Sequence, residues 1–235
     1  MQSAQQTAAT HTRPKNTEED IYTDLYNAIL ERRLPPETKL GEQPLAEYYG
    51  VSRTIIRQVL SRLAHDRLVK LEPNRGAFVA RLSMEAARQI YDAWRLIEAA
   101  IIRDVAQSIT KKQVATLKKL IAEEREACDQ RDMPRLTRLS AQFHMKLADF
   151  CRNQYLSKFL KELVPQTSLA FFYEVENMPI CTKDEHSEIL DLIAAGDVEG
   201  AVAAAMRHLD GIEAGLNARA ALARPQSLIE ILKAR

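Results

Sequence analysis

Apolar side chains recur at three- and four-residue steps along most of this chain, which is the spacing of amphipathic helices. The first such helix is expected to begin at Thr17, whose hydroxyl can open a capping box, and to end before Pro35. Two short helices packed across a tight turn are predicted next, with Gly50 at the turn and Ser52 as the cap of the second helix. A two-stranded wing follows them. Its predicted strands are 69–72 and 77–80, joined by a turn at 73–76.

From Ser83 onward every segment has helical periodicity, and no strand pattern occurs outside the wing. Capping boxes are expected at Thr110 and at Thr182, Gly196 is expected to end one helix, and Asp197 to cap the next. The fold class is therefore mainly α, an N-terminal winged helix-turn-helix followed by an all-helical bundle of six or seven helices. The expected divisions are a disordered tail (1–17), a winged domain (18–82), a helical domain (83–222) and a C-terminal tail or short helix (223–235).

Composition narrows the class of protein. The 235 residues give room for two modest domains or one large one, and seven glycines among many helix formers favour helix over sheet. No apolar run approaches the roughly 20 residues of a membrane span, and the polar N-terminus is not a secretory signal. The three cysteines, Cys128, Cys151 and Cys181, lack a paired spacing, and we expect reduced thiols in a cytoplasmic protein.

Charge is informative only locally, because the chain carries a formal net charge of +1. Between Ser52 and Arg81 there are seven Lys or Arg residues against two acids, so this small element is strongly basic. Arg53, Thr54 and Arg57 occupy the face of the second short helix that its apolar residues leave free. A helix-turn-helix with a basic wing suits a protein that enters the major groove and contacts the flanking phosphates.

Three histidines face inward in the predicted bundle, each in line with apolar residues of its own helix: His144, His186 and His208. One buried imidazole is usually a hydrogen-bonded structural residue, whereas a divalent metal would satisfy three such nitrogens together. Zinc suits imidazole ligands first, then nickel or another first-row ion. The pattern leaves open whether the three converge on a metal or are separate core residues. Cys181, just ahead of His186, is either an ordinary thiol or a fourth ligand.

Arg95 and Glu98 are three residues apart in the first helix of the predicted bundle. The simpler interpretation is an ion pair within the helix. The alternative is that Arg95 turns inward and binds an anionic ligand with its planar guanidinium group. The spacing by itself favours the ion pair.

Taken together, these residues resemble the GntR family of bacterial transcription regulators, in its FadR-like branch with a helical FCD domain. In the first domain the resemblance rests on residues of the helix-turn-helix and of the wing: Leu45, Ala46, Gly50, Val51, Ser52, Arg53, Thr54, Arg57, Arg75 and Gly76. Departures occur at Glu37, Ile55 and Gln58, and they indicate an altered DNA preference. The resemblance implies DNA contacts, which fall on Gln43, Ser52, Arg53, Thr54, Arg57, Asn74, Arg75 and Gly76.

In the second domain the resemblance rests on Phe143-His144, Glu185-His186 and His208. It implies that the three histidines bind a metal, zinc first. In metal-binding members an Asp precedes the first of these histidines by four residues, and Ser140 stands in that place here. Water, Ser140 or an effector would then have to fill the place of the missing anionic ligand. The resemblance also implies that Arg95 contacts a small carboxylate effector.

The function that follows is a cytoplasmic, homodimeric, ligand-responsive transcription regulator, expected to be a repressor. It would bind a short inverted repeat in duplex DNA and no membrane. The rival is a metal-dependent hydrolase or hydratase, because a three-His zinc site with an open position is found in such enzymes. No general base, nucleophile motif or phosphate-binding loop supports it, and we expect no enzymatic activity.

Overall fold

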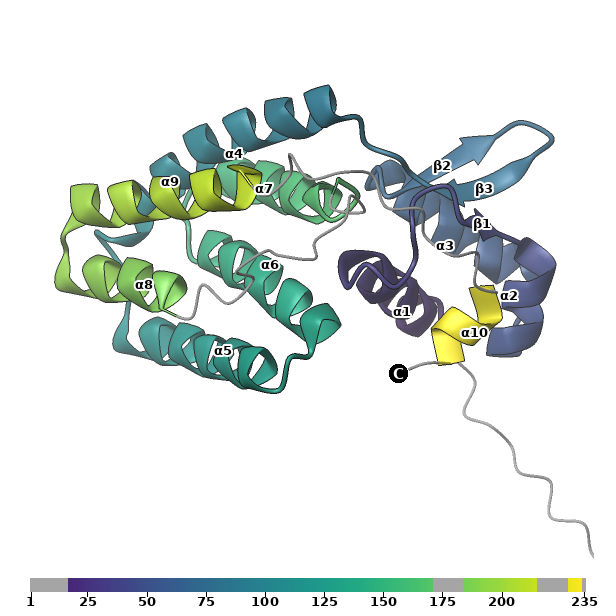
Figure 1. Ribbon diagram of the computed structural model, residues 1–235, viewed down its shortest axis with the longest axis horizontal. Coiled ribbons are helices and arrows are strands. Elements are labelled where there is room, and N and C mark those ends of the chain that lie inside the picture. The colour runs from purple at the N-terminus through teal and green to yellow at the C-terminus, as the bar shows by residue number, and fades with distance from the viewer. Residues whose placement is uncertain (1–16, 171–183, 215–227, 234–235) are drawn as a thin grey trace, which may run out of the picture.

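The computed structural model describes residues 17–170, 184–214 and 228–233. A small winged domain and a helical bundle lie side by side in it, as Figure 1 shows. The winged domain contains α1 (Glu18–Leu30), β1 (Lys39–Leu40), α2 (Glu42–Tyr49), α3 (Arg53–His65), β2 (Val69–Glu72) and β3 (Gly76–Val79). The remaining helices are α4 (Met84–Val105), α5 (Lys111–Asp129), α6 (Met133–Asp149), α7 (Gln154–Thr167), α8 (Glu185–Ala195), α9 (Val198–Ala214) and α10 (Leu228–Lys233).

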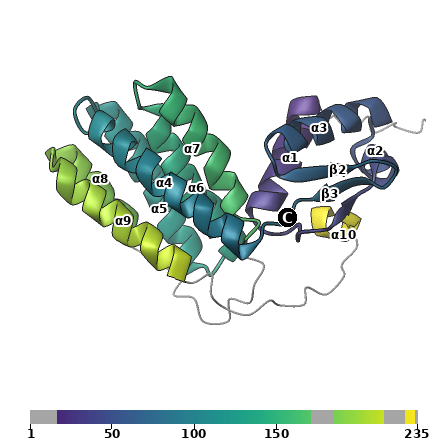
Figure 2. The same ribbon diagram turned by 90° about the horizontal axis from the view of Figure 1, so that it is seen from above.

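The mainly α fold class is confirmed, with a small wing after the helix-turn-helix and six helices, α4 to α9, described in the bundle. Each domain has its own apolar core. In the winged domain, Leu25, Leu45 and Ile56 lie at the centre and are fully buried. In the bundle, Phe143 and Leu147 of α6 pack against neighbouring helices. Figure 2 shows from above that the bundle helices lie roughly along one common direction.

The turn between α2 and α3 forms for the reasons expected from the sequence. Gly50 ends α2 in the left-handed region with φ of 69°. Ser52 caps α3 by accepting a hydrogen bond from the backbone N–H of Ile55. Left-handed backbone is costly for residues with a Cβ, so glycine is favoured at this turn. The helix-turn-helix geometry therefore depends on these two positions.

The sheet has one more strand than predicted. Its order is β1-β3-β2, and both pairings are antiparallel. Lys39 of β1 pairs with Phe78 of β3. The statement that no strand lies outside the wing is therefore wrong, because a two-residue strand is too short to show alternation. Glu37, where the resembled family has a turn glycine, adopts a positive φ of 68° just before this strand.

Most expected caps form. The capping boxes at Thr17 and Thr110 are both present, and the side chain of Asp197 accepts from the N–H of Gly200 at 3.0 Å. The prediction that a capping box at Thr182 opens α8 is wrong. That helix begins at Glu185 with Asp184 at the N-cap and no side-chain cap hydrogen bond. Thr182 lies outside the described residues.

The cysteines also differ from expectation. Cys151 is a buried free thiol, but Cys128 is disulfide-bonded. The expectation that all three cysteines are reduced is therefore wrong for Cys128. Cys181 lies outside the described residues, so neither interpretation of it is tested.

Helix α6 connects the two domains. The Tyr26 hydroxyl of α1 contacts the Met145 sulfur of α6 at 3.6 Å. Arg138 of α6 forms an ion pair with Glu31, at the end of α1, at 2.7 Å. Both partners in that pair are largely buried, with side chains 25% and 13% exposed, so water screens them weakly. Helix α1 in turn packs on α3.

Candidate functional site

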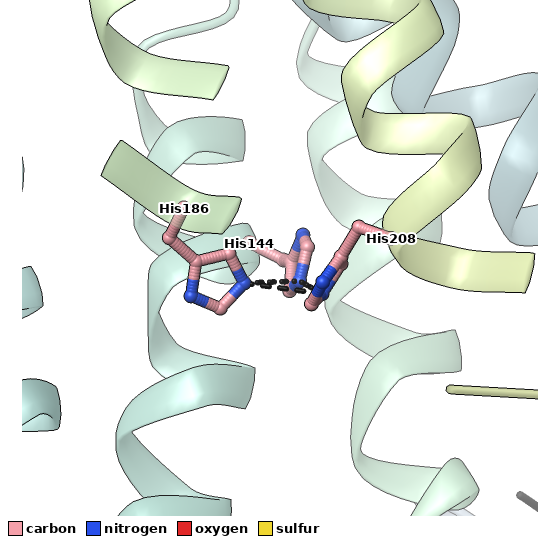
Figure 3. A group of neighbouring side chains, drawn as sticks. All are labelled: His144, His186 and His208. Carbon is pink, nitrogen blue, oxygen red and sulfur yellow. Dashed lines mark hydrogen bonds between the residues drawn. The ribbon is translucent and has the colours of Figure 1, made fainter. Parts of the chain in front are cut away.

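The structure brings the three predicted histidines together. His144 comes from α6, His186 from α8 and His208 from α9, and all three side chains are at most 2% exposed. Their Nε2 atoms form a triangle with sides of 3.1, 3.2 and 3.3 Å. Figure 3 shows the three rings pointing toward one another. Helix α6 and the two consecutive helices α8 and α9 thus place three ring nitrogens around one point.

Each histidine is oriented by a carboxylate on its other ring nitrogen. The Nδ1 atoms of His144, His186 and His208 lie 2.6, 2.7 and 2.6 Å from glutamate oxygens. The three partners, in the same order, are Glu98, Glu124 and Glu185. An ionised carboxylate only accepts, so the proton of each imidazole belongs on Nδ1. The three Nε2 lone pairs then face one another. This carboxylate–histidine arrangement is the one that orients imidazole ligands around metal ions.

Burial shifts the pKa values of groups in this cluster. Glu98 is fully buried, and burial raises the pKa of its carboxyl to about 7. Its second oxygen accepts from the Trp94 indole N–H. Burial lowers the pKa of His144 well below the usual value, and it lowers that of His208 as well. Burial therefore favours the neutral form of His144 and His208, which is the form that binds a metal.

The dimensions fit a small divalent ion. A tetrahedral zinc site with Zn–N bonds of about 2.0–2.1 Å has N···N edges of about 3.3–3.4 Å. The observed sides of 3.1–3.3 Å are close to three edges of such a site. No proton is left between the nitrogens when all three Nδ1 atoms donate to carboxylates. The donor set, three neutral imidazoles supported by three carboxylates, thus fits the metal that the resemblance implies.

Sequence reasoning missed Glu98 and Glu124 as partners of the histidines. The sequence feature that could have revealed them is an acidic residue on the apolar face of a predicted helix. Glu98 lies one turn from Trp94 and Ile101, and Glu124 lies one turn from Ile121. Burying a carboxylate is unfavourable without a partner, so an acid on an inward face indicates an inward partner. Glu185 was part of the quoted motif, but it binds His208 and not its neighbour His186.

The expected ion pair between Arg95 and Glu98 is wrong, because Glu98 turns inward to His144. Arg95 instead binds acids of α4 and α9, and its own side chain is 20% exposed. Its guanidinium contacts Asp92 at 3.3 Å, Asp210 at 2.9 Å and also Glu213. Arg95 therefore joins α4 to the last turns of α9, the helix that carries His208.

Ser140 lies one turn before His144 on α6 and is half-buried. It occupies the position for which an anionic ligand was expected from the resemblance. Its hydroxyl carries no charge, so the protein supplies three neutral ligands to the centre from the residues described.

The predicted recognition helix presents its arginines to solvent. The side chains of Arg53 and Arg57 are 55% and 58% exposed. Both bind Glu42 at the start of α2, each at 2.9 Å. One carboxylate thus holds two guanidinium groups in position at the beginning of α3. Such an arrangement limits the rotamers of long side chains, which lowers the entropy cost of ordering them on a ligand.

The other predicted DNA contacts surround this point or form the wing tip. Ser52 and Thr54 flank Arg53 in the chain and are exposed, and Gln43, which follows Glu42 on α2, is exposed as well. At the wing tip, Asn74 and Gly76 have positive φ values of 60° and 102°, and the Arg75 side chain is 70% exposed. The tight turn between β2 and β3 therefore presents an exposed basic side chain, which forms an ion pair with Glu72 of β2.

A winged helix-turn-helix with exposed arginines is typical of DNA-binding proteins, and here it is joined to a helical bundle with a buried polar centre. Two family models match the chain. Residues 17–79 match "Bacterial regulatory proteins, gntR family", and residues 89–211 match "FCD domain". The chain therefore belongs to the GntR family of transcription regulators, with an FCD domain.

Similar curated proteins agree with this assignment. HTH-type transcriptional repressor RspR of Escherichia coli is 25% identical over 203 residues, which cover 86% of this chain and 88% of that protein. HTH-type transcriptional regulator LutR of Bacillus subtilis is 26% identical over 202 residues, with coverage of 77% and 92%.

Solved structures show the same fold. E. coli McbR/YncC superposes with a TM-score of 0.77 at 19% identity, covering 85% of this chain and 96% of that one. The structure of a putative transcriptional regulator GntR from Rhodococcus sp. RHA1 gives a TM-score of 0.73 at 23% identity, with the same coverage. In the described part of the chain, no helix combines the length and apolar character needed to cross a membrane.

Proposed function

We propose that this GntR-family regulator is a metal-containing homodimer that binds an inverted-repeat operator and changes its DNA affinity when a small carboxylate binds the bundle. We further propose that it acts as a repressor, as the name of the similar protein RspR says of that protein. The exposed pair Arg53 and Arg57 supports the DNA-binding part. The triangle of Nε2 atoms is the observation that carries the sensor part.

In the DNA-binding part, α3 enters the major groove and the wing contacts flanking phosphates. Arg53 and Arg57 read base edges, because a guanidinium can donate two parallel hydrogen bonds to guanine. Gln43, Ser52 and Thr54 contact the backbone or bases beside them, and the wing tip (74–76) contacts phosphates. Glu42 has to release at least part of its two ion pairs for these contacts, which disfavours binding to unspecific sequences.

Fluorescence anisotropy with genomic fragments tests this assignment. Affinity is expected to fall steeply as salt rises, because phosphate contacts release counterions. Substitution of Arg53 or Arg57 by Ala is expected to weaken binding and relax base preference. Lys119→Ala on α5, whose side chain is 82% exposed, serves as a matched control. Unchanged affinity in both arginine variants would exclude α3 as the reading helix.

In the sensor part, His144, His186 and His208 hold the metal, and zinc fits the imidazole donor set. When bound, the ion would offer a Lewis-acidic position to an anionic oxygen. The three glutamates keep the imidazoles in the ligating tautomer, and the apolar core around Phe143 excludes water.

The effector would approach from the side of Ser140 and of α4, where Arg95 lies. Arg95 is already occupied by Asp210 and Glu213. An anionic effector therefore has to compete with these carboxylates, and success would loosen α9 from α4. Such competition gives the ligand a different affinity for two arrangements of the helices, which is the requirement for a ligand-driven change.

The homodimer is supported by the outer surface of α4 and α7. Four large apolar side chains are exposed among the described residues. Leu71 lies on the wing, and the other three are Leu96 (77% exposed), Tyr155 (73%) and Phe159 (47%). The last three lie on these two helices, which pack against each other. A two-fold interface needs a surface that matches itself, and exposed apolar and aromatic groups favour one.

Metal analysis of protein made without a histidine tag tests the centre. We expect about one first-row ion per chain, lost when His186 is replaced by Ala and kept when the surface residue His65 is replaced. Absence of metal after incubation with zinc, in protein that still binds its operator, would leave a regulator with an organic effector site only.

The rival, a metal-dependent hydrolase, also uses three imidazoles and an open position. Hydrolysis of candidate esters by the purified protein, abolished by chelation and by His186→Ala, would favour it.

A further inference from the structure

The C-terminal helix α10 packs against the winged domain at the opposite end of the chain. It lies outside both family-matched segments, 17–79 and 89–211. Ile231 and Leu232 are 6% and 1% exposed, and both belong to the apolar core of the winged domain. The Tyr48 hydroxyl of α2 donates to the carbonyl oxygen of Leu232 at 2.9 Å. Figure 1 shows α10 next to α2.

The helical form of α10 depends on this contact. Helices shorter than about 12 residues are marginal in water, because nucleation fixes several residues for one hydrogen bond. α10 has six residues. The carbonyls of its last turn have no partner within the helix, and Tyr48 satisfies one of them. Docking and helix formation are therefore coupled, and release of α10 means its unfolding.

The position of α10 leaves the DNA-reading surface free. Gln43 and Glu47 form one side of α2, joined by a 2.5 Å hydrogen bond. Tyr48 points about 140° away from Gln43, because successive helical residues are separated by about 100°. Arg53 and Arg57 keep 55% and 58% of their side chains exposed with α10 in place. α10 thus supports α2 from a different side and does not cover the arginines.

We propose that α10 is a brace for the helix-turn-helix: its docking on Tyr48 fixes α2, and through Glu42 the two reading arginines. The surface it occupies fits a short aliphatic helix, and its occupant is this chain's own C-terminus. Only 13 positions separate Leu228 from Ala214, the end of the sensor helix α9. The chain thus reaches the winged domain a second time, through the non-covalent docking of α10, besides the covalent linker at Ser83. This inference rests on the proposed DNA-binding function.

The test uses the full-length chain with Leu232→Asp, which places a charge in the winged core, and Tyr48→Phe, which removes only the hydrogen bond. Lys233→Ala, on the exposed side of α10, is the matched control. Amide hydrogen exchange of α2 and α10 is measured without DNA. Operator affinity is measured by anisotropy on a duplex selected by the wild-type protein.

For Leu232→Asp we expect at least tenfold faster exchange in α2 and operator affinity several-fold weaker, with the same base preference. Tyr48→Phe is expected to speed α2 exchange and weaken operator binding as well, but by smaller factors. This variant keeps the test valid if Leu232→Asp does not fold. Unchanged α2 exchange while α10 exchanges freely would overturn the brace. Tighter operator binding would also overturn it and make α10 a steric inhibitor. If the wild-type protein selects no duplex, the proposed function fails, whereas α2 exchange still decides the brace.

Discussion

Replacing Glu98 with Gln is the sharpest test of the histidine centre. One carboxylate oxygen accepts from His144 Nδ1 at 2.6 Å, and the other accepts from the Trp94 indole. Glutamine has nearly the same shape but only one acceptor oxygen. If that oxygen stays with Trp94, the amide N–H₂ faces His144 Nδ1. The proton of His144 then moves to Nε2, and that nitrogen can no longer bind a metal.

The size of the effect follows from burial. Loss of a supporting carboxylate costs about 10–100-fold in metal affinity, or about 1.4–2.7 kcal/mol. Glu98 is 0% exposed, so no water can replace the lost acceptor, and we expect the upper end of that range. Glu185→Gln is the matched control. The Glu185 side chain is 45% exposed, so water can hydrogen-bond His208 Nδ1 in its place, and we expect about tenfold or less.

Competition titration against a fluorescent zinc chelator measures both affinities at one pH. Thermal unfolding of the metal-free variants checks that each still folds. Equal affinity of Glu98→Gln and wild type would refute the reasoning. So would a larger loss in Glu185→Gln, because burial would then not control the effect.

Three further outcomes are expected. Chelation should lower the unfolding temperature, and zinc should restore it, since free metal at a thousand times Kd stabilises by about 4 kcal/mol; scanning calorimetry showing no shift would contradict a folded-state site. Phe159→Glu should convert dimer to monomer in sedimentation velocity, whereas Lys119→Glu should not, and a dimeric Phe159→Glu protein would move the interface elsewhere. Gly50→Ala should lower the free energy of unfolding by about 1–2 kcal/mol in urea titration, because the φ of 69° is unfavourable for a residue with a Cβ. Steric overlap adds nothing to this cost, since no atom lies within 4 Å of the added Cβ. An unchanged midpoint would mean that the turn relaxes.

Much of the winged domain could be predicted because its signals are local. Gly50 and Ser52 act on the backbone within a few residues of themselves, and the wing alternates over enough residues to be visible. The β1 strand escaped prediction because Lys39 and Leu40 are strand only through their partners on β3. The docking of α10 escaped for the same reason, since Ile231 and Leu232 are buried by residues nearly 200 positions earlier in the chain.

The candidate site was predictable in its members but not in its connections. Helical periodicity placed the three histidines inward, and only the packing of α6, α8 and α9 could bring them together. The Arg95–Glu98 error has the same origin. A three-residue step gives an ion pair worth a few tenths of a kcal/mol, which cannot compete with a buried hydrogen bond to His144.

Helix α6 holds His144 beside Met145, and it holds Arg138 less than two turns earlier. Sharp kinks in helices need a specific cause such as an interior proline, and the only proline of α6 lies in its first turn. A tilt of α6 caused by a change at His144 would therefore also shift the contacts that α6 makes with Tyr26 and Glu31. A change at the histidine centre would thus alter the angle of α6, and the winged domain would change its orientation as a result. No segment would have to fold or unfold for this to happen.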